Sequence, residues 1–422
     1  MESTIRQRIA MARMFCVLGM IYVHVPNGQQ GEAVVYGMGN GQLAGFLESF
    51  LVEGPGRAGA ALLSVISGYL AATALLRPGS SIKALYSRRF VSIVLPMTFW
   101  AVATYLVYLL VSQSRSTFLD DANTLMDHLN TILFLTHMPD GPTMHLGFLR
   151  DLFVCVLLSP LLLAVIQRAG WTLLLVLGLF YLLEHNQASI IILRPLVVFA
   201  FAIGVFMACR HTKLTALDPY WPIFIALAAM STVIIMMVNE GVAPGVENTF
   251  MQAGLQFNET VLYPIGRLFG SLAIWTVIPL MLGGRIENWV SRFSPYLFAA
   301  FCSHYLMLTL IFFGGWMPVF GDRQSEFFIV WFLFAPLLSM LVAFCIVQIT
   351  LKVAPPLATL ITGGRIKVPS NAADSQSQRR RQGFALGVAL SLMHTWDAVL
   401  RFSRVLSQEW LEASRRLLLG RR

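Results

Sequence analysis

The chain has 422 residues, of which 57% are hydrophobic and 12% are charged, and its formal net charge is +9 at pH 7. With a mean hydropathy of +0.69, this composition excludes an ordinary soluble globular protein. The positive charge does not indicate a nucleic-acid partner, because much of it lies in the C-terminal tail, at Arg379, Arg380, Arg381, Arg401, Arg404, Arg415, Arg416, Arg421 and Arg422.

Apolar runs long enough to cross a bilayer recur along the chain. The first is flanked by Arg6, Arg8 and Arg13 and lacks a small-residue cleavage site, so we expect a retained helix rather than a removed signal peptide. The sequence therefore predicts an all-α, polytopic membrane protein with about ten transmembrane helices. In chain order these predicted helices are residues 12–27, 56–76, 90–112, 148–167, 171–185, 193–209, 220–239, 264–283, 294–313 and 327–351.

The distribution of charge between the predicted connections indicates their orientation. Lysine and arginine favour one set of connections and acidic residues favour the other, so we expect both termini to be cytoplasmic. The longest outer loops are 28–55, 113–147 and 240–263, and loops of this length can receive a bulky hydrophilic substrate. The five cysteines all lie in apolar runs, and we expect them to be core residues rather than disulfides or metal ligands.

Three segments are expected along the chain. Residues 1–355 form the transmembrane domain, and a polar linker at 356–383 follows the Pro355-Pro356 pair. Residues 384–422 combine apolar side chains with arginines at helical spacing, which predicts a basic amphipathic helix on the inner membrane face. An eleventh span through 384–400 is the alternative.

Arg13 and His24 lie in the first predicted helix. Their spacing of eleven residues is about three helical turns, which puts both side chains on one face, roughly 16 Å apart along the axis. Ionisable groups at membrane depth are costly and usually face a cavity or a partner. Two interpretations follow: the pair is functional, or Arg13 is a cytoplasmic anchor and His24 bonds to a loop at the far end of the helix.

Four short motifs follow one another along the chain. They are Arg13 with His24; Gly56-Arg57-Ala58-Gly59 with Ile66-Ser67-Gly68-Tyr69-Leu70; Ser87-Arg88-Arg89-Phe90 with Leu95-Pro96; and Ser294-Pro295-Tyr296 with Ser303-His304. Together, over about residues 8–350, they resemble the acyltransferase-3 family of bacterial inner-membrane acyltransferases. The chain departs from the family at Gly147, after His145-Leu146, where relatives often have tryptophan. We also expect no C-terminal hydrolase-like domain of the kind that is fused to some relatives.

The resemblance implies a multi-pass protein of the bacterial inner membrane. It implies transfer of an acyl group, acetyl or succinyl, from cytoplasmic acyl-CoA to a hydroxyl of an extracytoplasmic polysaccharide or glucan. Acyl-CoA is then a donor substrate, and no permanently bound cofactor is expected. The expected partners are acyl-CoA, a glycan or lipid-linked glycan, membrane lipids and proteins of polysaccharide synthesis.

The phosphates of such a donor need a positively charged binding site at the cytoplasmic face. Arg13, Arg88 and Arg89 are the candidate donor-binding residues, because arginine forks suit phosphate oxygens. The alternative is that Arg88 and Arg89 only follow the positive-inside rule.

Neutral histidine is suited to removing a proton from a sugar hydroxyl near pH 7. We expect His24 to be the general base of a direct transfer, or the acceptor of a transient acyl group. His304 is the second candidate catalytic residue; it could orient the acceptor, stabilise the oxyanion or simply bond to a backbone carbonyl. His145 is a candidate for substrate binding.

Arg57, Arg150, Arg194 and Arg267 lie at the predicted outer starts of four helices. Either they are paired locally, as Arg150 with Asp151 suggests, or some of them bind a carboxylate of the acceptor or of a succinyl group. No metal site is expected among His128, His137 and His145 and their acidic neighbours, because no spacing there matches a ligand pattern.

Two other functions remain open from the sequence. One is a transporter of a lipid-linked sugar or small anion, although the chain has no internal repeat or inverted symmetry. The other is a non-catalytic component of a polysaccharide-synthesis complex that docks through its basic tail.

Overall fold

The computed structural model describes residues 3–28, 36–38, 42–112, 125–134, 143–183, 193–240, 257 and 261–366. The regular structure in these ranges is helical, which confirms the all-α prediction. The α-helices are α1 (Ser3–Val23), α2 (Leu43–Leu51), α3 (Arg57–Leu75), α4 (Ile82–Arg89), α5 (Leu95–Ser112), α6 (Leu125–Leu133), α7 (Gly147–Leu183), α8 (Pro195–Cys209), α9 (Trp221–Glu240), α11 (Tyr263–Val277), α12 (Arg285–Phe293), α13 (Leu297–Ile311), α14 (Met317–Phe320), α15 (Phe328–Val353) and α16 (Pro355–Ile361).

Seven helical stretches of the described residues are long and apolar enough to cross a membrane, so the protein is a polytopic membrane protein. They are Leu43–Leu75, Ile82–Leu110, Met144–Leu183, Asp218–Glu240, Tyr263–Met281, Leu297–Phe320 and Phe328–Val353. The predicted helices 148–167 and 171–185 are two arms of α7, which is kinked at Ala169 (φ −139, ψ 46). Apolar α8 is shorter than the others, and α1 carries three arginines. Ten spans and cytoplasmic termini remain predictions.

Two of these spans begin earlier than the sequence predicts, because π-helical turns continue the helix through expected breaks. The turn η2 (Val52–Gly56) joins α2 to α3 and accommodates Pro55, so that the helix begins inside the predicted loop 28–55. The turn η3 (Phe90–Val94) joins α4 to α5 in the same way. π-helical turns are rare and often lie at functional sites.

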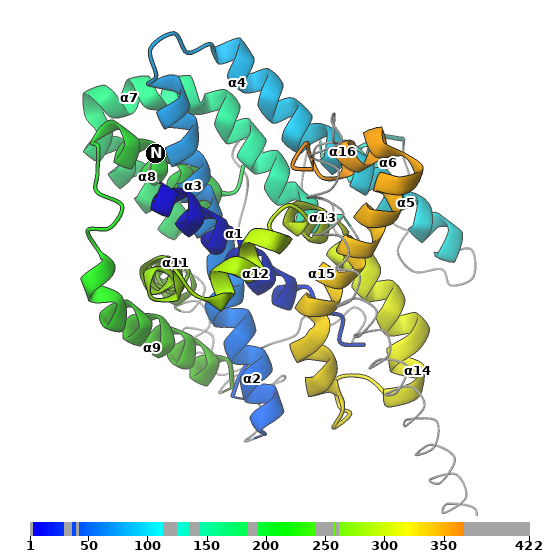
Figure 1. Ribbon diagram of the computed structural model, residues 1–422. Helices are drawn as coiled ribbons and strands as arrows, with labels where there is room; N and C mark the ends of the chain where they lie inside the picture. The colour runs from blue at the N-terminus through cyan, green and yellow to red at the C-terminus, as the bar shows by residue number, and fades with distance from the viewer. Residues whose placement is uncertain are drawn as a thin grey trace, which may run out of the picture.

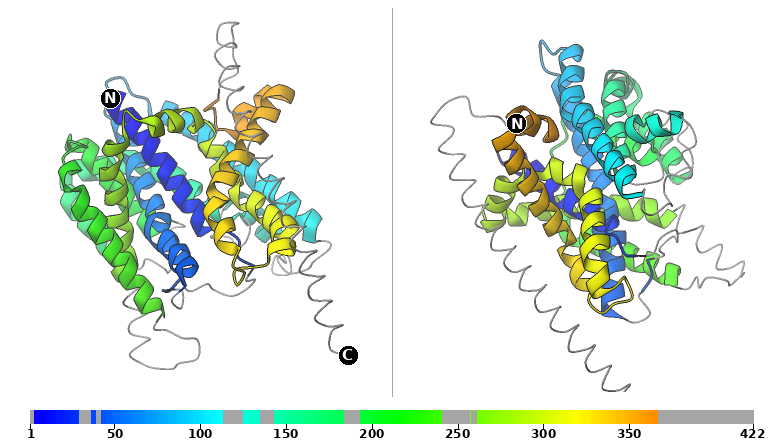
Figure 2. Two further views of the ribbon diagram at one scale, coloured as in Figure 1. Left: turned by 60° about the horizontal axis from the view of Figure 1, so that its bottom comes forward. Right: turned by 90° about the vertical axis from the view of Figure 1, so that its right-hand side faces the viewer.

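Helix α1 runs through the middle of the molecule, in contact with α3, α12, α13 and α15 (Figure 1). It ends at Val23, so His24 is the first residue after the helix rather than part of it. Helices α9 and α11 lie on one side of α1, and α13 and α15 lie on the other (Figures 1 and 2). This central position allows residues of α1 to reach several other helices.

Helices α3 and α8 pack most closely of all, through two glycines. A Cβ atom on Gly68 of α3 would overlap the backbone of Phe201, and one on Gly204 of α8 would overlap the backbone of Val65. Gly68 belongs to the Ser-Gly-aromatic motif. The motif glycine is therefore explained by helix packing, because only a residue without a side chain fits there.

Arg8 fixes the start of α1 to two other segments. Only 1% of this arginine is exposed, and its guanidinium donates to both carboxylate oxygens of Asp218, at 2.9 and 2.6 Å. It also donates to the carbonyl of Trp275 and lies 4.1 Å from the centroid of that ring. A buried guanidinium requires such partners.

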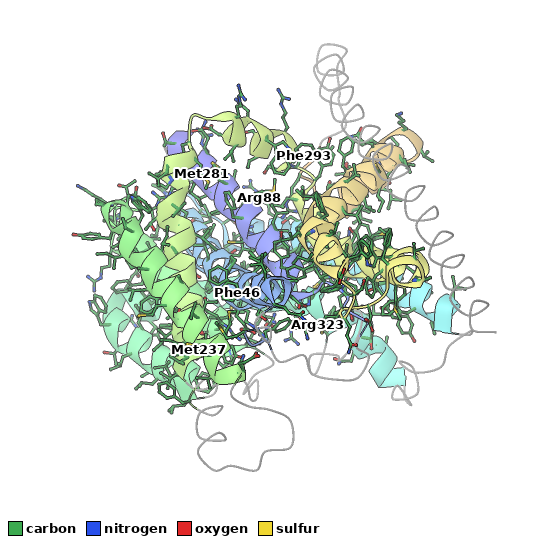
Figure 3. All side chains as sticks on the ribbon, turned by 90° about the horizontal axis from the view of Figure 1, so that it is seen from below. Phe46, Arg88, Met237, Met281, Phe293 and Arg323 are labelled. Carbon is green, nitrogen blue, oxygen red and sulfur yellow. The ribbon has the colours of Figure 1, made fainter. Side chains whose placement is uncertain are left out.

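We call the end of the molecule that holds the start of α1, the α3–α4 connection and α16 the basic end (Figure 2). It carries Arg6, Arg77, Lys83 and Lys352. Figure 3 views the molecule from the opposite end, with Phe46 of α2, Met237 of α9 and Arg323 labelled. By the positive-inside rule the basic end is the predicted cytoplasmic face.

The chain stays ordered beyond residue 355, where the sequence predicts a linker. Helix α16 occupies the first residues of that predicted linker, and the described structure continues to Ile366, which is buried. The Trp100 indole of α5 donates to the carbonyl of Ile361 at 3.2 Å. The rest of the predicted linker and the tail helix 384–422 lie outside the described residues. All five cysteines are described and free, and Cys16, Cys155 and Cys302 are buried, as expected for core residues.

Candidate functional site

A cavity of about 320 Å³ lies between α1, α3, α4, α7 and α13. Three arginines line it: Arg13 of α1, Arg89 at the end of α4, and Arg365 after α16. No acidic residue is part of the lining, and no ion pair within the described residues joins a carboxylate to any of the three. We call this space the arginine cavity. Its uncompensated positive charge suits an anionic ligand.

Each of the four sequence motifs contributes to the arginine cavity. Arg13 comes from the first motif, Ser67 from the second, Arg89 from the third, and Ser294 with Pro295 from the fourth. The fold thus brings to one place residues that lie far apart in the sequence.

The candidate donor-binding residues are not all in this cavity. Arg13 and Arg89 line it, whereas Arg88 is exposed and does not belong to the lining. The roles predicted for these three residues remain predictions.

The sequence analysis missed Arg365, because it placed this residue in the polar linker. Arg365 is exposed to solvent. Desolvation by the surrounding protein and the charges of Arg13 and Arg89 lower the pKa of its guanidinium to about 10, so it stays charged at neutral pH. The signal that could have revealed an ordered position is the glycine pair Gly363-Gly364 after the apolar α16, since glycine commonly ends a helix.

Three histidines from distant parts of the chain form a second feature, which we call the histidine cluster. His24 follows α1, His145 precedes α7, and His304 lies in α13. The ring centroids are 4.7 Å apart for His145 and His304, 5.5 Å for His24 and His304, and 6.2 Å for His24 and His145. His145 and His304 are buried and His24 is half-buried. All the histidines named as site candidates therefore meet.

Hydrogen bonds to backbone carbonyls define the tautomers of the two buried histidines. His145 Nε2 lies 3.0 Å from the carbonyl oxygen of Cys302, and His304 Nδ1 lies 2.6 Å from that of Phe301. A carbonyl oxygen only accepts, so these nitrogens donate, and in a neutral ring the other nitrogen is left with a lone pair. Those nitrogens, His145 Nδ1 and His304 Nε2, are buried without a partner in the described structure. His304 therefore does bond to a backbone carbonyl, and its predicted catalytic roles remain predictions.

Phe301 adjoins both the arginine cavity and the histidine cluster. It lines the cavity, and its ring centroid is 6.1 Å from that of His145 and 5.8 Å from that of His304. Phe148, which also lines the cavity, lies 6.1 Å from Phe301. The lining of the cavity thus comes next to the histidine cluster at Phe301.

The predicted outer arginines have local partners. Arg150 and Arg194 both bind Asp151, at 2.6 and 2.7 Å, and that carboxylate is fully buried. The pairing of Arg150 with Asp151 is therefore confirmed.

The other two outer arginines also have neighbours. Arg57 forms an ion pair with Glu53 at 2.7 Å, and the Arg267 guanidinium interacts electrostatically with Tyr181. Substrate binding by Arg57, Arg150 and Arg267 remains a prediction. The charges of Arg57 and Arg194 act on His24, so these two arginines lie near the histidine cluster.

Among the described residues, no group of His, Cys, Asp or Glu has a geometry that could hold a metal ion. The side chain of His128, and the whole of His137 with Asp120, Asp121 and Asp140, lie outside what the structure describes.

Residues 6–348 match the model of a protein family described as an acyltransferase domain. The chain belongs to the acyltransferase-3 family. This confirms the resemblance carried by the four motifs, and the matched residues include the histidine cluster and all of the arginine cavity except Arg365.

One curated relative of this acyltransferase-3 protein is the succinoglycan biosynthesis protein ExoH of Rhizobium meliloti (strain 1021). The two chains are 26% identical over 369 residues, which cover 86% of this chain and 94% of the relative. No solved structure matches the chain.

Proposed function

We propose that the protein is an inner-membrane O-acyltransferase that moves an acetyl or succinyl group from cytoplasmic acyl-CoA to a hydroxyl of an extracytoplasmic polysaccharide or glucan. The observation that carries this proposal is that Phe301 lines the arginine cavity and also lies beside the histidine cluster, so the two features adjoin. Membership of an acyltransferase family supports the reaction class. The relative named for succinoglycan biosynthesis supports an exopolysaccharide acceptor.

The donor enters at the basic end in this scheme. Its phosphates bind Arg13 and Arg89, and its pantetheine arm extends along the apolar part of the cavity towards Phe301. A thioester placed there meets the histidine cluster, which the acceptor reaches from the opposite end. The two substrates thereby meet within the bundle, and neither has to cross it.

His24 acts as the general base. It is half-buried. Within the described residues the rings of His145 and His304 form hydrogen bonds, whereas the ring of His24 forms none. His24 takes the hydroxyl proton while the hydroxyl oxygen attacks the thioester carbonyl carbon. The carbon–sulfur bond then breaks, the thiolate takes the proton back from His24, and free CoA and the ester leave.

His304 orients the acceptor. Its buried Nε2 carries a lone pair in the neutral ring, so it can accept a hydrogen bond from a hydroxyl but cannot donate one to an oxyanion. His145 Nδ1 offers a second acceptor of the same kind. The positive charges of Arg57 and Arg194 favour the negative charge that develops on the carbonyl oxygen.

The test measures consumption of acetyl-CoA and succinyl-CoA by the full chain in nanodiscs, with an acidic exopolysaccharide as acceptor. Arg89→Gln should raise the KM for the donor about ten-fold, because it removes a charged hydrogen bond, and Arg88→Gln should raise it less. Consumption of neither donor would contradict the proposal, and flux of a lipid-linked sugar through the same nanodiscs would favour the transporter.

A further inference from the structure

Arg365 lies beyond the residues that match the family, yet it lines the arginine cavity together with Arg13 and Arg89. We propose that Arg365 is a third donor-binding residue, which binds the phosphates of the nucleotide part of acyl-CoA. The segment Pro355–Ile366 is then part of the donor site, although it lies outside the family domain. This inference rests on the proposed function.

The position of Arg365 is determined by the way α16 ends. The amides of Gly363 and Gly364 donate to the carbonyls of Leu360 and Thr359, at 2.9 and 2.8 Å. Both glycines have positive φ, +62° and +73°, a conformation that other residues rarely adopt. A Cβ atom on Gly363 would overlap the Arg365 guanidinium, so this turn also leaves the space that the guanidinium occupies.

Contacts with neighbouring segments hold the Arg365 side chain at the cavity. Its Nη1 donates to the carbonyl of Thr362 at 3.0 Å and to that of Ser92, in η3, at 3.3 Å. The guanidinium carbon lies 3.9 Å from the ring centroid of Phe298, another lining residue. Its hydrogen bonds within the described residues all use Nη1, so the donors on Nε and Nη2 are left available to a ligand.

The charge of the cavity favours binding of an anion. Arg13 and Arg89 act electrostatically on one another and on Arg365. Like charges gathered in a partly enclosed space repel unless a counter-charge binds between them. Phosphate supplies that charge in a form that arginine forks recognise, and the nucleotide part of CoA carries several phosphate groups. The headgroup of an anionic lipid shares this chemistry, so the experiment must separate the two sources.

The experiment measures equilibrium binding of CoA and of pantetheine, which lacks the nucleotide and its phosphates, to the full chain in nanodiscs of zwitterionic lipid. Arg365→Gln should weaken CoA binding about ten-fold or more and leave pantetheine binding unchanged, because only CoA carries the phosphates. The matched control is Lys352→Gln, since Lys352 is an exposed cation at the end of α15 outside the cavity, and it should change neither affinity.

An unchanged CoA affinity in Arg365→Gln, or equal weakening of both ligands, would overturn the inference. A second result would also overturn it. If phosphatidylglycerol competes with CoA in the wild type but not in Arg365→Gln, and Arg365→Gln keeps its CoA affinity in zwitterionic nanodiscs, then Arg365 binds a lipid headgroup instead. If Arg365→Gln does not fold, Arg365→Lys replaces it. Lysine keeps the charge but loses the fork, and a several-fold loss of CoA affinity alone is expected.

The outcome is separable from that of the proposed function. If acyl transfer depends on Arg89 but CoA affinity does not depend on Arg365, the proposed function is supported and the role of Arg365 is rejected. If CoA affinity depends on Arg365 but no acyl group is transferred to any glycan, the role of Arg365 is supported and the proposed function is rejected.

Discussion

The imidazoles of His145 and His304 each have one nitrogen hydrogen-bonded to a backbone carbonyl, and the other nitrogen has no partner among the described residues. Such a ring cannot turn without breaking a buried hydrogen bond, so its bare nitrogen has a fixed direction. His24 has no such tie among the described residues, which fits a group that must take and return a proton. The three histidines therefore differ in their hydrogen bonding although they share one site.

The first prediction concerns His304. His304→Ala should lower kcat about a hundred-fold, because the acceptor hydroxyl loses its orienting partner. The KM for acyl-CoA should hardly change, because His304 does not line the arginine cavity. Steady-state kinetics with varied donor measures both constants, and His211→Ala, in the α8–α9 connection, is the control. A raised KM with an unchanged kcat would place His304 in donor binding instead.

The second prediction concerns Asp151, which is fully buried and pairs with both Arg150 and Arg194. Asp151→Asn leaves two guanidinium groups without their counter-charge, and we expect a loss of about 3–5 kcal/mol in stability. Arg194→Gln should cost less, because 41% of the Arg194 side chain is exposed. Thermal unfolding in detergent measures both changes. An Asp151→Asn protein as stable as the wild type would show that this carboxylate does not hold the arginines.

At the scale of the helices, the close packing of α3 against α8 holds the cavity wall that contains Ser67. The third prediction is that Gly68→Ala sharply lowers the melting temperature, because the new methyl group overlaps the backbone of α8. Gly314→Ala is the matched control: a Cβ atom there meets nothing within 4 Å. Equal melting temperatures for the two variants would mean that the α3–α8 contact tolerates a methyl group.

The sequence predicted most helices from hydrophobic runs, but the predicted start of a helix was wrong where the helix continues through an expected break. Pro55 and its flanking glycines are strong turn signals, yet a π-helical turn carries the helix through them. Around Ala169, by contrast, the predicted break between two helices is present, as the kink inside α7. Such outcomes depend on what the neighbouring helices pack against, and hydrophobic periodicity contains no information about that.

At the scale of the whole molecule, the site depends on contacts between distant parts of the chain. The sequence named Arg13, His24, Arg89 and His304, because ionisable residues in apolar runs stand out. It did not reveal that His145 joins the cluster, since nothing in a loop-flanking histidine indicates its partners. The sequence could not predict the position of Arg365, because the end of α16 and the contacts of Arg365 with Phe298 and Ser92 determine it.

The central claim is that acyl transfer passes through the histidine cluster, and the most direct test compares wild type with His24→Ala in full-length protein in nanodiscs. The measurement is acyl-ester formation on the exopolysaccharide together with release of free CoA. We predict that His24→Ala binds CoA with unchanged affinity, because the arginine cavity is intact, and loses ester formation by at least about a hundred-fold. Full ester formation by a correctly folded His24→Ala protein would contradict the account.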